Sequence, residues 1–407
     1  MANQIRVLYS FPHKLGADRI CYTAWQQVNG LAQAGAKVLV YPGAMSREVS
    51  PEVSVKPTLA IGRARLPYRI LGTLKTLALH DAIVAKRLRS IANEIDIVHT
   101  WPLGSLRTLK VARELGIPTV LERPNAHTRF AYEVVAAECK KVGITLPDSH
   151  EHAYNKQPLS REEAEYMAAF RLLSPSDFVS KTFIDLGFSP ERIMRHQYGY
   201  DDVAYFPGQQ QCDQGVPLRM LFVGGCAPRK GLHYALEAWL RSEASRSGEF
   251  LIAGAFVPGY AERMDEMLSH PSIRILGHRK DVPELMRKSH ILVLPSVEEG
   301  SALVTSEARG SGCVLLVSEA AGAMCTHMKD ALVHSVGDVA AITQHIDLLN
   351  SDRHLLASLR EASLNTSKQI TWKAAGLKLL SVYCDAIAMY RESTELSAKR
   401  DVCSSRI

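Results

Sequence analysis

Two glutamates lie eight positions apart around a strand-to-helix junction, and their carboxylates could bind sugar hydroxyls. Residues 291–294 are a short apolar run typical of a strand buried on both faces, and a helix is predicted over residues 301–309. Glu299 lies in the intervening loop, where it could hold hydroxyls of a transferred group. Glu307, about two turns into the helix, could accept hydrogen bonds from a ribose diol.

The start of this helix could bind a diphosphate. A helix N-terminus presents unpaired backbone N–H groups and a partial positive charge, here at Gly300, Ser301 and Ala302. Gly300 has no side chain, so a phosphate could approach its backbone closely. Taken alone, the glutamate pair has a simpler alternative, with one carboxylate in water and the other on a solvated helix face.

The order of residues around the two glutamates resembles the signature of the retaining glycosyltransferases of family 4. That signature reads P-S-x-x-E-G-x-x-L-x-x-x-E-A-x-x-x-G, followed by a strand and a small-residue turn. The departures concern the donor rather than the fold: Ser301 replaces a frequent aromatic residue, Ala302 a usual glycine, and Ala323 the second glycine of the closing pair. The resemblance implies that the run from Gly300 to Leu303 binds the donor. The matching positions are Pro295, Ser296, Glu299, Gly300, Leu303, Glu307, Ala308, Gly312 and Gly322.

A second group of chemically useful residues lies in FVGGCAPRKGL, residues 222–232. A predicted buried strand ends at Gly224 and Gly225, and Arg229 with Lys230 precedes a helix. The spacing is neither a Walker loop nor G-x-G-x-x-G, which disfavours a nucleotide triphosphatase and a dehydrogenase. In family 4 a basic pair here stabilises the leaving diphosphate. Lys230 matches the family's lysine, whereas Gly225 stands where its arginine usually does, and we expect Arg229 to substitute. The alternative is an ordinary solvated pair at a helix start.

Apolar runs alternate with helical patterns along the whole chain, which predicts parallel sheets built from strand-helix-strand units. The resemblance implies the GT-B architecture, an α/β fold in which two Rossmann-like, doubly wound domains face each other across a cleft. We expect an acceptor-side domain over residues 1–206, a linker over 207–217 and a donor-binding domain over 218–375. Residues 376–407 would form a helix that crosses back toward the first domain, followed by a frayed tail.

His127 is the candidate catalytic residue of the first domain. It lies in ERPNAHT just after a predicted strand, where relatives in the family carry a histidine that contacts the transferred sugar. Glu122 and Asn125 nearby could contact acceptor or donor. A single loop histidine is more often solvated or a helix cap, so only its place in the family pattern favours the catalytic interpretation.

Three further candidates for donor binding come from the resemblance. The loop after Gly277 would cradle the base, with Arg279 beside it, while Lys280 is interpreted as solvated. Gly16, in a predicted loop over residues 13–18, would approach the diphosphate.

Two histidines in the first half invite a metal interpretation, which we consider weak. His150, Glu151 and His152 lack a spaced third ligand. The family needs no metal for transfer, so we expect neither a metal nor a cofactor, only a nucleotide-diphosphate sugar as co-substrate.

Residues 61–90 are strongly basic and could rest on an anionic membrane surface. Such a surface would suit a lipid-linked acceptor, although a sugar or small-molecule hydroxyl acceptor is equally open. The alternative is an amphipathic helix packed on its own domain with a solvated basic face. Nucleic acid is not an expected partner, because no recognised module is present. The basic residues are Arg63, Arg65, Arg69, Lys75, Lys86, Arg87 and Arg89, against the single acid Asp81.

Composition limits the cellular setting. The chain has 407 residues, a net charge of +6 and eight cysteines without C-x-x-C spacing, as expected for reduced thiols. No apolar run reaches the length of about 18 residues that a membrane span needs. We therefore expect a cytoplasmic protein, which could lie peripherally on the inner face of the membrane.

The resemblance implies transfer of a sugar from a nucleotide-diphosphate donor, with a UDP or GDP base, to a hydroxyl acceptor with retention at the anomeric carbon. Polysaccharide or glycolipid assembly is the expected setting. Two alternatives stay open: a nucleotide-sugar epimerase of the same architecture, and a catalytically weak glycan- or lipid-binding scaffold. The missing arginine at Gly225 favours the scaffold.

Overall fold

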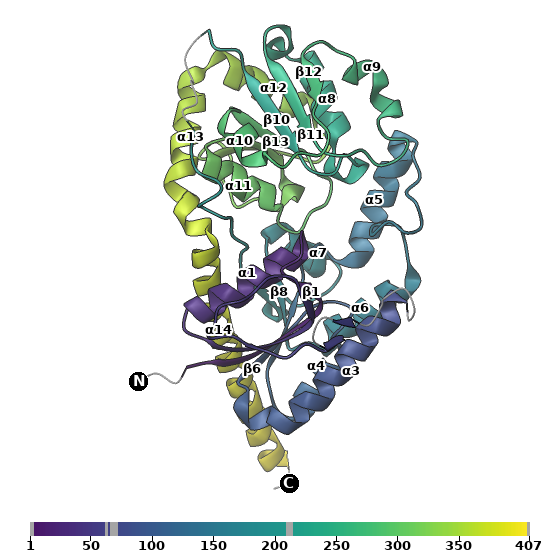
Figure 1. The fold of residues 1–407 in the computed structure, drawn as a ribbon, viewed down its shortest axis with the longest axis vertical. Helices are drawn as coiled ribbons and strands as arrows, with labels where there is room; N and C mark the ends of the chain where they lie inside the picture. Colours follow the sequence, from purple (N-terminus) through teal and green to yellow (C-terminus); the bar gives the residue numbers. More distant parts are fainter. Residues whose placement is uncertain (1–3, 62–63, 66–71, 209–214, 405–407) are drawn as a thin grey trace.

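The computed structural model describes residues 4–61, 64–65, 72–208 and 215–404. These residues form two α/β domains, each built on a parallel sheet, stacked along the long axis of the molecule (Figure 1). The expected fold class is confirmed. The linker expected over residues 207–217 falls largely outside the described residues.

The first domain contains a parallel sheet in the order β3-β2-β1-β6-β7-β8-β9. Its strands are β1 (Arg6–Leu15), β2 (Lys37–Met45), β3 (Ser54–Val55), β6 (Ile97–Thr100), β7 (Thr119–Glu122), β8 (Arg171–Ser174) and β9 (Ile193–Arg195). The order reverses at β1 and β6, as in a doubly wound sheet. Its helices are α1 (Ile20–Gln33), α3 (Thr73–Ile91), α4 (Leu106–Glu114), α5 (Thr128–Val142), α6 (Lys156–Ala168) and α7 (Asp177–Asp185). β4 (Ala60–Ile61) pairs antiparallel with β5 (Ala64–Arg65).

The second domain repeats this plan with strands in the order β12-β11-β10-β13-β14-β15. The strands are β10 (Arg219–Val223), β11 (Glu249–Ala253), β12 (Ile273–Ile275), β13 (Ile291–Leu294), β14 (Val314–Ser318) and β15 (Ala331–His334). The helices are α8 (Leu232–Arg241), α9 (Asp265–Leu268), α10 (Val282–Arg287), α11 (Leu303–Ser311), α12 (Val339–Ser351), α13 (Arg353–Ser367) and α14 (Trp372–Ser404).

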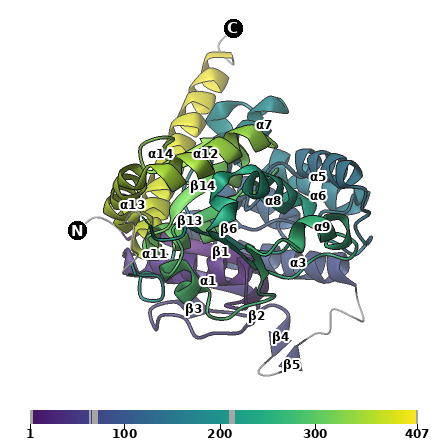
Figure 2. The ribbon, with the colours of Figure 1, turned by 90° about the horizontal axis from the view of Figure 1, so that it is seen from above.

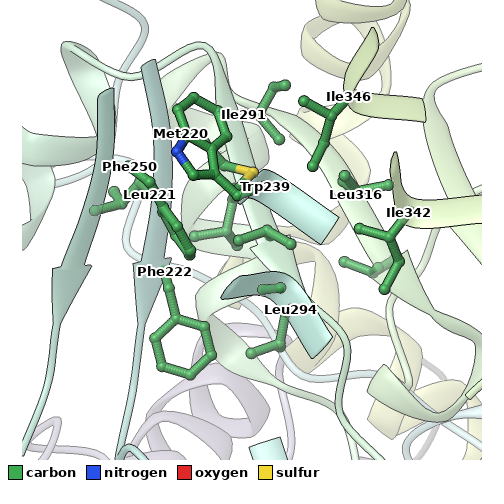
Figure 3. Packing of buried hydrophobic residues seen from close by; sticks show 14 of the residues in the cluster. Met220, Leu221, Phe222, Trp239, Phe250, Ile291, Leu294, Leu316, Ile342 and Ile346 are labelled. Carbon is green, nitrogen blue, oxygen red and sulfur yellow. The ribbon is translucent and has the colours of Figure 1, made fainter. Parts of the chain in front are cut away.

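Apolar strands hold the second sheet in place. Every residue of β13 is fully buried, because helices cover both faces of a doubly wound sheet. Trp239 of α8 packs against Phe250 of β11, and Ile342 and Ile346 of α12 lie over the neighbouring strands (Figure 3). This core fixes the carboxyl ends of β10 and β13, from which the candidate site is built.

Two local expectations were wrong in detail. β1 continues to Leu15, so residues 13–15 of the predicted loop, His13 among them, lie in the strand. The pairing of β1 with β2 shifts register between Phe11 and Lys14, which lets the strand continue past the expected turn. The helix expected over residues 301–309 is α11, Leu303–Ser311, and it ends at Gly312, whose φ of +88° only glycine adopts easily.

The chain passes between the two domains twice, once near Tyr200 and once near Trp372, and the two connecting segments lie side by side. Tyr200, on the first crossing, accepts a backbone hydrogen bond from Trp372 and donates one to Ile370 on the second. The chain then continues into α14, which packs on α1 of the first domain through Gly30 and Gly376. Figure 1 shows α13 beside the second domain and α14 continuing along the first, and both views (Figures 1 and 2) show the C-terminal end of α14 projecting beyond that domain.

Candidate active site

A glycine turn brings the two candidate motifs together. Gly231 lies between the short helix at residues 228–230 and α8, with a φ of +65°. A Cβ there would lie 2.0 Å from the carbonyl oxygen of Pro295, so only glycine allows this approach. The backbone N–H of Val297 donates to the carbonyl of Arg229 at 2.8 Å. The loop after β10 is therefore locked onto the loop after β13.

This contact creates a cluster of two cations and two carboxylates, which we call the charge cluster: Arg229, Lys230, Glu298 and Glu299. Arg229 Nη1 lies 3.1 Å from both Glu298 Oε2 and Glu299 Oε1, and Lys230 Nζ forms an ion pair with Glu299 Oε1. Arg229 also donates to the carbonyl of Glu298 at 2.9 Å. The structure thus brings together the predicted residues Arg229, Lys230 and Glu299.

Burial tunes the charges of the cluster. It lowers the pKa of Lys230, an effect that the neighbouring Glu299 carboxylate partly offsets. Burial alone would raise the pKa of Glu299, but the charges of Arg229 and Lys230 hold it below its ordinary value. The pKa of Glu298 is raised, chiefly by burial. Lys230 and Glu299 thus stabilise each other's charged forms, whereas Glu298 ionises less readily.

The charge cluster also meets the first domain. The N–H of Ala126 donates to Glu298 Oε1 at 3.1 Å, and the hydroxyl of Ser176 donates to the carbonyl of Gly300. A Cβ on Gly300 would lie 1.5 Å from the carbonyl oxygen of Pro124. The close approach at Gly300 is therefore to the backbone of the other domain.

Glu307 lies deeper along α11, beside the segment that joins the domains. Its carboxylate hydrogen bonds with the hydroxyl of Tyr205, and Asp201 is a second negative charge nearby. Burial, with the charge of Asp201, raises the pKa of Glu307 to about 7. Glu307 is therefore a carboxylate without a cationic partner in the described structure, unlike Glu299.

His127 is not part of the charge cluster. Its side chain caps α5 by accepting from the N–H of Arg129 at 3.2 Å, and its ring packs on those of Tyr166, Phe183 and Phe188. It is 3% exposed, and burial, then the charge of Arg123, lowers its pKa to about 3. The side chain thus caps the helix, as in the capping alternative, and its contact with a sugar stays a prediction.

The other predicted donor contacts are dispersed. Gly224 lies beside Lys230: a Cβ added at Gly224 would lie 3.9 Å from Lys230 Cε. A Cβ added at Gly225 would meet no atom within 4 Å. The N–H of Ala302 already donates to the carbonyl of Ala321 at 3.2 Å, so it is not free for a phosphate as predicted.

Three remaining candidates lie away from the charge cluster's contacts. Gly277 has a φ of +65° and open space around it. Arg279 is exposed and pairs with Asp281 at 2.5 Å. Gly16 is buried, and its carbonyl accepts from Arg47 Nε at 2.8 Å.

A cavity of about 530 Å³ lies on the first-domain side of the charge cluster. Its lining includes Trp101, Asn125, His150 and His152, together with Arg123. His152 is buried, and its pKa is lowered by that burial and then by the charges of Arg229, His150 and Lys230. Ala126 also lines the cavity, and its N–H donates to Glu298, so the cavity adjoins the charge cluster.

The first sheet carries a closed hydrogen-bond network at its carboxyl edge. Glu122, at the end of β7, is fully buried and accepts from His196 at 2.8 Å, Tyr198 at 2.9 Å and Gln27 at 3.0 Å. Burial opposes its ionisation, but His196 outweighs this and lowers the pKa of Glu122. Glu122 thus holds together three segments of the fold and does not face the cavity as a free ligand group.

Comparison with known proteins agrees with this geometry. Residues 217–352 match the family model for glycosyl transferases group 1. That match covers most of the second domain and about a third of the chain. No curated protein gives a significant match to the sequence.

Solved structures of similar fold extend over nearly the whole chain. HepE from Anabaena, solved with UDP and glucose, has 15% identity and a TM-score of 0.62, covering 94% of this chain and 100% of its own. Sucrose-phosphate synthase from Thermosynechococcus elongatus has 17% identity and a TM-score of 0.66, covering 95% and 100%. WaaG, a glycosyltransferase of lipopolysaccharide biosynthesis, has 15% identity and a TM-score of 0.59, covering 91% and 99%. The fold is that of the GT-B glycosyltransferases.

Within this GT-B fold, three site residues were missed from the sequence. Glu298 was passed over although it adjoins Glu299, and His152 was considered only as a metal ligand. Tyr205, the partner of Glu307, lies in the segment that joins the two domains. Each is placed by a contact between distant segments, which spacing along the chain does not reveal.

The basic stretch is only partly described. α3 buries Leu77, Val84 and Leu88 against its own domain. Arg89 pairs with Glu114 at 2.6 Å, while Lys75 and Lys86 are exposed. Arg63 and Arg69, with the side chain of Arg65, lie outside the described residues. Among the residues that the structure describes, no helix is long and apolar enough to span a membrane.

Proposed function

We propose that the chain is a retaining glycosyltransferase of family 4. It would move a sugar from a nucleoside-diphosphate donor to a hydroxyl acceptor, in polysaccharide or glycolipid assembly. The single observation that carries this proposal is the charge cluster at the carboxyl edge of the second sheet, within the residues that match the family model. Parallel α/β sheets bind ligands at that edge.

The leaving diphosphate is the group that Lys230 would stabilise. As the bond between the anomeric carbon and the diphosphate oxygen breaks, negative charge develops on the phosphate and positive charge on the sugar. A buried ammonium at that position lowers the energy of the charged transition state. The acceptor oxygen then bonds to the anomeric carbon on the same face, and its proton passes to the departing phosphate oxygen.

Glu299 would exchange partners during this step. In the structure it pairs with Lys230, and a diphosphate would compete for the same ammonium. Once released, the Glu299 carboxylate can accept hydrogen bonds from sugar hydroxyls, while Arg229 stays bound to Glu298 and holds the loop. Arg229 is then a positioning residue and not a direct substitute for the arginine missing at Gly225.

Glu307 and the first-domain cavity complete the assignment. Glu307 would accept the ribose hydroxyls of the nucleotide, displacing Tyr205. The cavity beside His152 would receive the acceptor, and its mixed aromatic and polar lining suits a sugar. A UDP base is favoured by HepE, whose structure holds UDP.

A nucleotide-binding measurement tests the proposal. Calorimetric titration of UDP, GDP and ADP into the full-length protein should show binding of one of them, weakened at least tenfold by Lys230→Ala. The matched control is Lys280→Ala, which removes an exposed lysine and should leave the affinity unchanged. NMR of the transfer product then reports the anomeric configuration. Equal affinity in both lysine variants would refute the assigned site.

A further inference from the structure

A separate cavity of about 320 Å³ lies at the opposite end of the first sheet. It is lined by the start of β7 at Thr119, the start of β8 at Arg171 and residue Tyr390 of α14. Because the carboxyl ends of these parallel strands point to the charge cluster, their amino ends point away from it. The cavity is therefore distinct from the candidate active site.

Three arginines line this cavity: Arg113, Arg171 and Arg192. Among the described residues, none of the three forms an ion pair, and no carboxylate lines the cavity. Arg113 lies in the last turn of α4 and is exposed, while its neighbour Glu114 pairs with Arg89 at 2.6 Å instead. The cavity thus concentrates positive charge without a counter-charge in its wall.

The guanidinium groups are held in place but keep donors to spare. Arg171 lies over the ring of Phe170 at 3.8 Å and donates through Nη1 to the Phe170 carbonyl at 3.1 Å, whereas its Nε is buried without a partner. Arg192 donates through Nη2 to the carbonyls of Tyr166 and Ala169 at 2.6 and 2.8 Å. Since each guanidinium has five N–H donors, both retain donors for a ligand.

A purely structural role explains only part of this arrangement. Arg192 caps the carbonyls at the end of α6, which accounts for its own position. It does not account for the unpaired Nε of Arg171 or for Arg113. Burial and the charge of Arg192 lower the pKa of Arg171, with only the exposed Glu191 opposing them. Adjacent, partly buried cations raise the energy of the fold unless an anion binds between them.

Two exposed methionines contact the arginines of the cavity. Met167 and Met389 are 67% and 43% exposed. Their sulfurs lie 3.9 Å from Arg192 Nη1 and 3.8 Å from Arg171 Nη2. An exposed thioether on each side of the arginines could contact the apolar part of a ligand whose anionic group binds in the cavity.

We propose that this three-arginine cavity binds a phosphate group. Guanidinium groups recognise phosphate through paired N–H donors, and the volume accommodates a phosphate ester with part of its carrier. The phosphate could be soluble or could be the headgroup of a membrane lipid. Both sources share the chemistry that the arginines recognise.

Titration of inorganic phosphate into full-length Lys230→Ala protein tests the site, because this background weakens binding at the charge cluster. Arg113→Gln should reduce phosphate affinity about three- to tenfold at constant ionic strength, without lowering the thermal midpoint in the absence of phosphate. Arg107→Gln is the matched control, since it removes an exposed arginine of the same helix that does not line the cavity. Arg171→Gln should have a larger effect than Arg113→Gln.

Sedimentation with vesicles identifies the source of the phosphate. Vesicles of phosphatidylcholine with phosphatidylglycerol, but not phosphatidylcholine alone, should retain the protein if the ligand is a lipid headgroup, and Arg113→Gln should release it. Binding of inorganic phosphate that depends on Arg113, without vesicle binding, would assign a soluble ligand. If Arg113→Gln and Arg107→Gln behave alike in both assays, the proposal is overturned.

Discussion

The carboxyl edges of the two sheets meet at the same interface but use buried charge differently. On the second sheet, Lys230 and Glu299 form an ion pair in which an anionic ligand could replace Glu299 as the partner of Lys230. On the first sheet, Glu122 accepts hydrogen bonds from His196 and Tyr198 of one segment and from Gln27 of α1. The charged groups of the second sheet could change partners when a ligand binds, whereas the buried carboxylate of the first sheet holds segments of the fold together.

This difference indicates which domain carries the chemistry. An anionic ligand can replace a carboxylate as the partner of a buried cation, because the cation then stays paired with a negative charge. A carboxylate that accepts several buried hydrogen bonds cannot be withdrawn without leaving each donor unpaired. In the proposed function, the second domain would therefore supply the reacting charges, and the first domain would supply a rigid wall and a cavity.

The largest expected effect is on catalysis at the carboxyl edge of the second sheet. Lys230→Ala should reduce sugar transfer by at least about 100-fold, since it removes the cation nearest the leaving phosphate. Initial rates with the cognate donor measure this. Lys280→Ala should transfer at the wild-type rate, and a similar loss in both variants would show that the effect is not specific to the charge cluster.

The next largest effect is on the free energy of unfolding, through Glu122 at the carboxyl edge of the first sheet. Glu122→Ala should lower the free energy of unfolding by about 3 kcal/mol, because the donors of His196, Tyr198 and Gln27 lose their acceptor. Urea denaturation measures this against Glu133→Ala, which removes an exposed glutamate from α5. A change below about 0.5 kcal/mol for Glu122→Ala would mean that the network does not support the fold.

A substitution at Gly300 tests the close contact between the two domains. Gly300→Ala would place a Cβ 1.5 Å from the Pro124 carbonyl oxygen, so the loop must move away from the first domain. We expect a loss of about 1–3 kcal/mol in the free energy of unfolding. Gly225→Ala, where a Cβ meets open space, is the control for stability. Equal stability of the two variants would contradict the close interdomain contact.

The smallest effect concerns the pH response of Glu307. Its pKa is about 7 in the folded protein, against 4.5 ordinarily, so the folded state holds this proton more tightly than the unfolded state. The stability that this group contributes is complete below pH 4.5 and is lost as the pH rises through about 7. Glu307→Gln should therefore lose less stability than wild type between pH 5 and about 7.5, as measured by urea denaturation at several pH values.

Nucleotide binding should show the opposite trend with pH. A ribose diol donates both hydrogen bonds to an ionised carboxylate, so nucleotide affinity should rise as Glu307 ionises near pH 7. Glu307→Gln should bind about tenfold more weakly at pH 8 and show little change with pH. A wild-type affinity that does not vary between pH 6 and about 8 would contradict this role.

Much of the fold and part of the site could be predicted from the sequence, because their signals lie in short contiguous runs of residues. Runs such as residues 291–294 are buried on both faces, so their composition alone predicts parallel strands. Lys230 and Glu299 lie in contiguous motifs at strand ends, and parallel strands bring such ends together. The signal for these elements is contained in a few neighbouring residues.

The remainder depends on contacts between distant segments. His127 follows a strand, as a catalytic histidine would, yet Tyr166 and Phe183 enclose its ring from other helices. Tyr205 approaches Glu307 only because the interdomain segment returns past α11. The extension of β1 to Leu15 likewise depends on its pairing with β2. None of these contacts leaves a periodic pattern in the sequence.

Donor cleavage gives the most direct test of the central claim, that the charge cluster acts on a nucleoside-diphosphate sugar. Release of nucleoside diphosphate from UDP-, GDP- and ADP-sugars can be measured without knowing the acceptor, because water can replace it slowly. The account predicts release from donors of one base, abolished by Lys230→Ala and retained by Lys280→Ala. Equal release by wild type and Lys230→Ala, or no binding and no release with any donor, would contradict it.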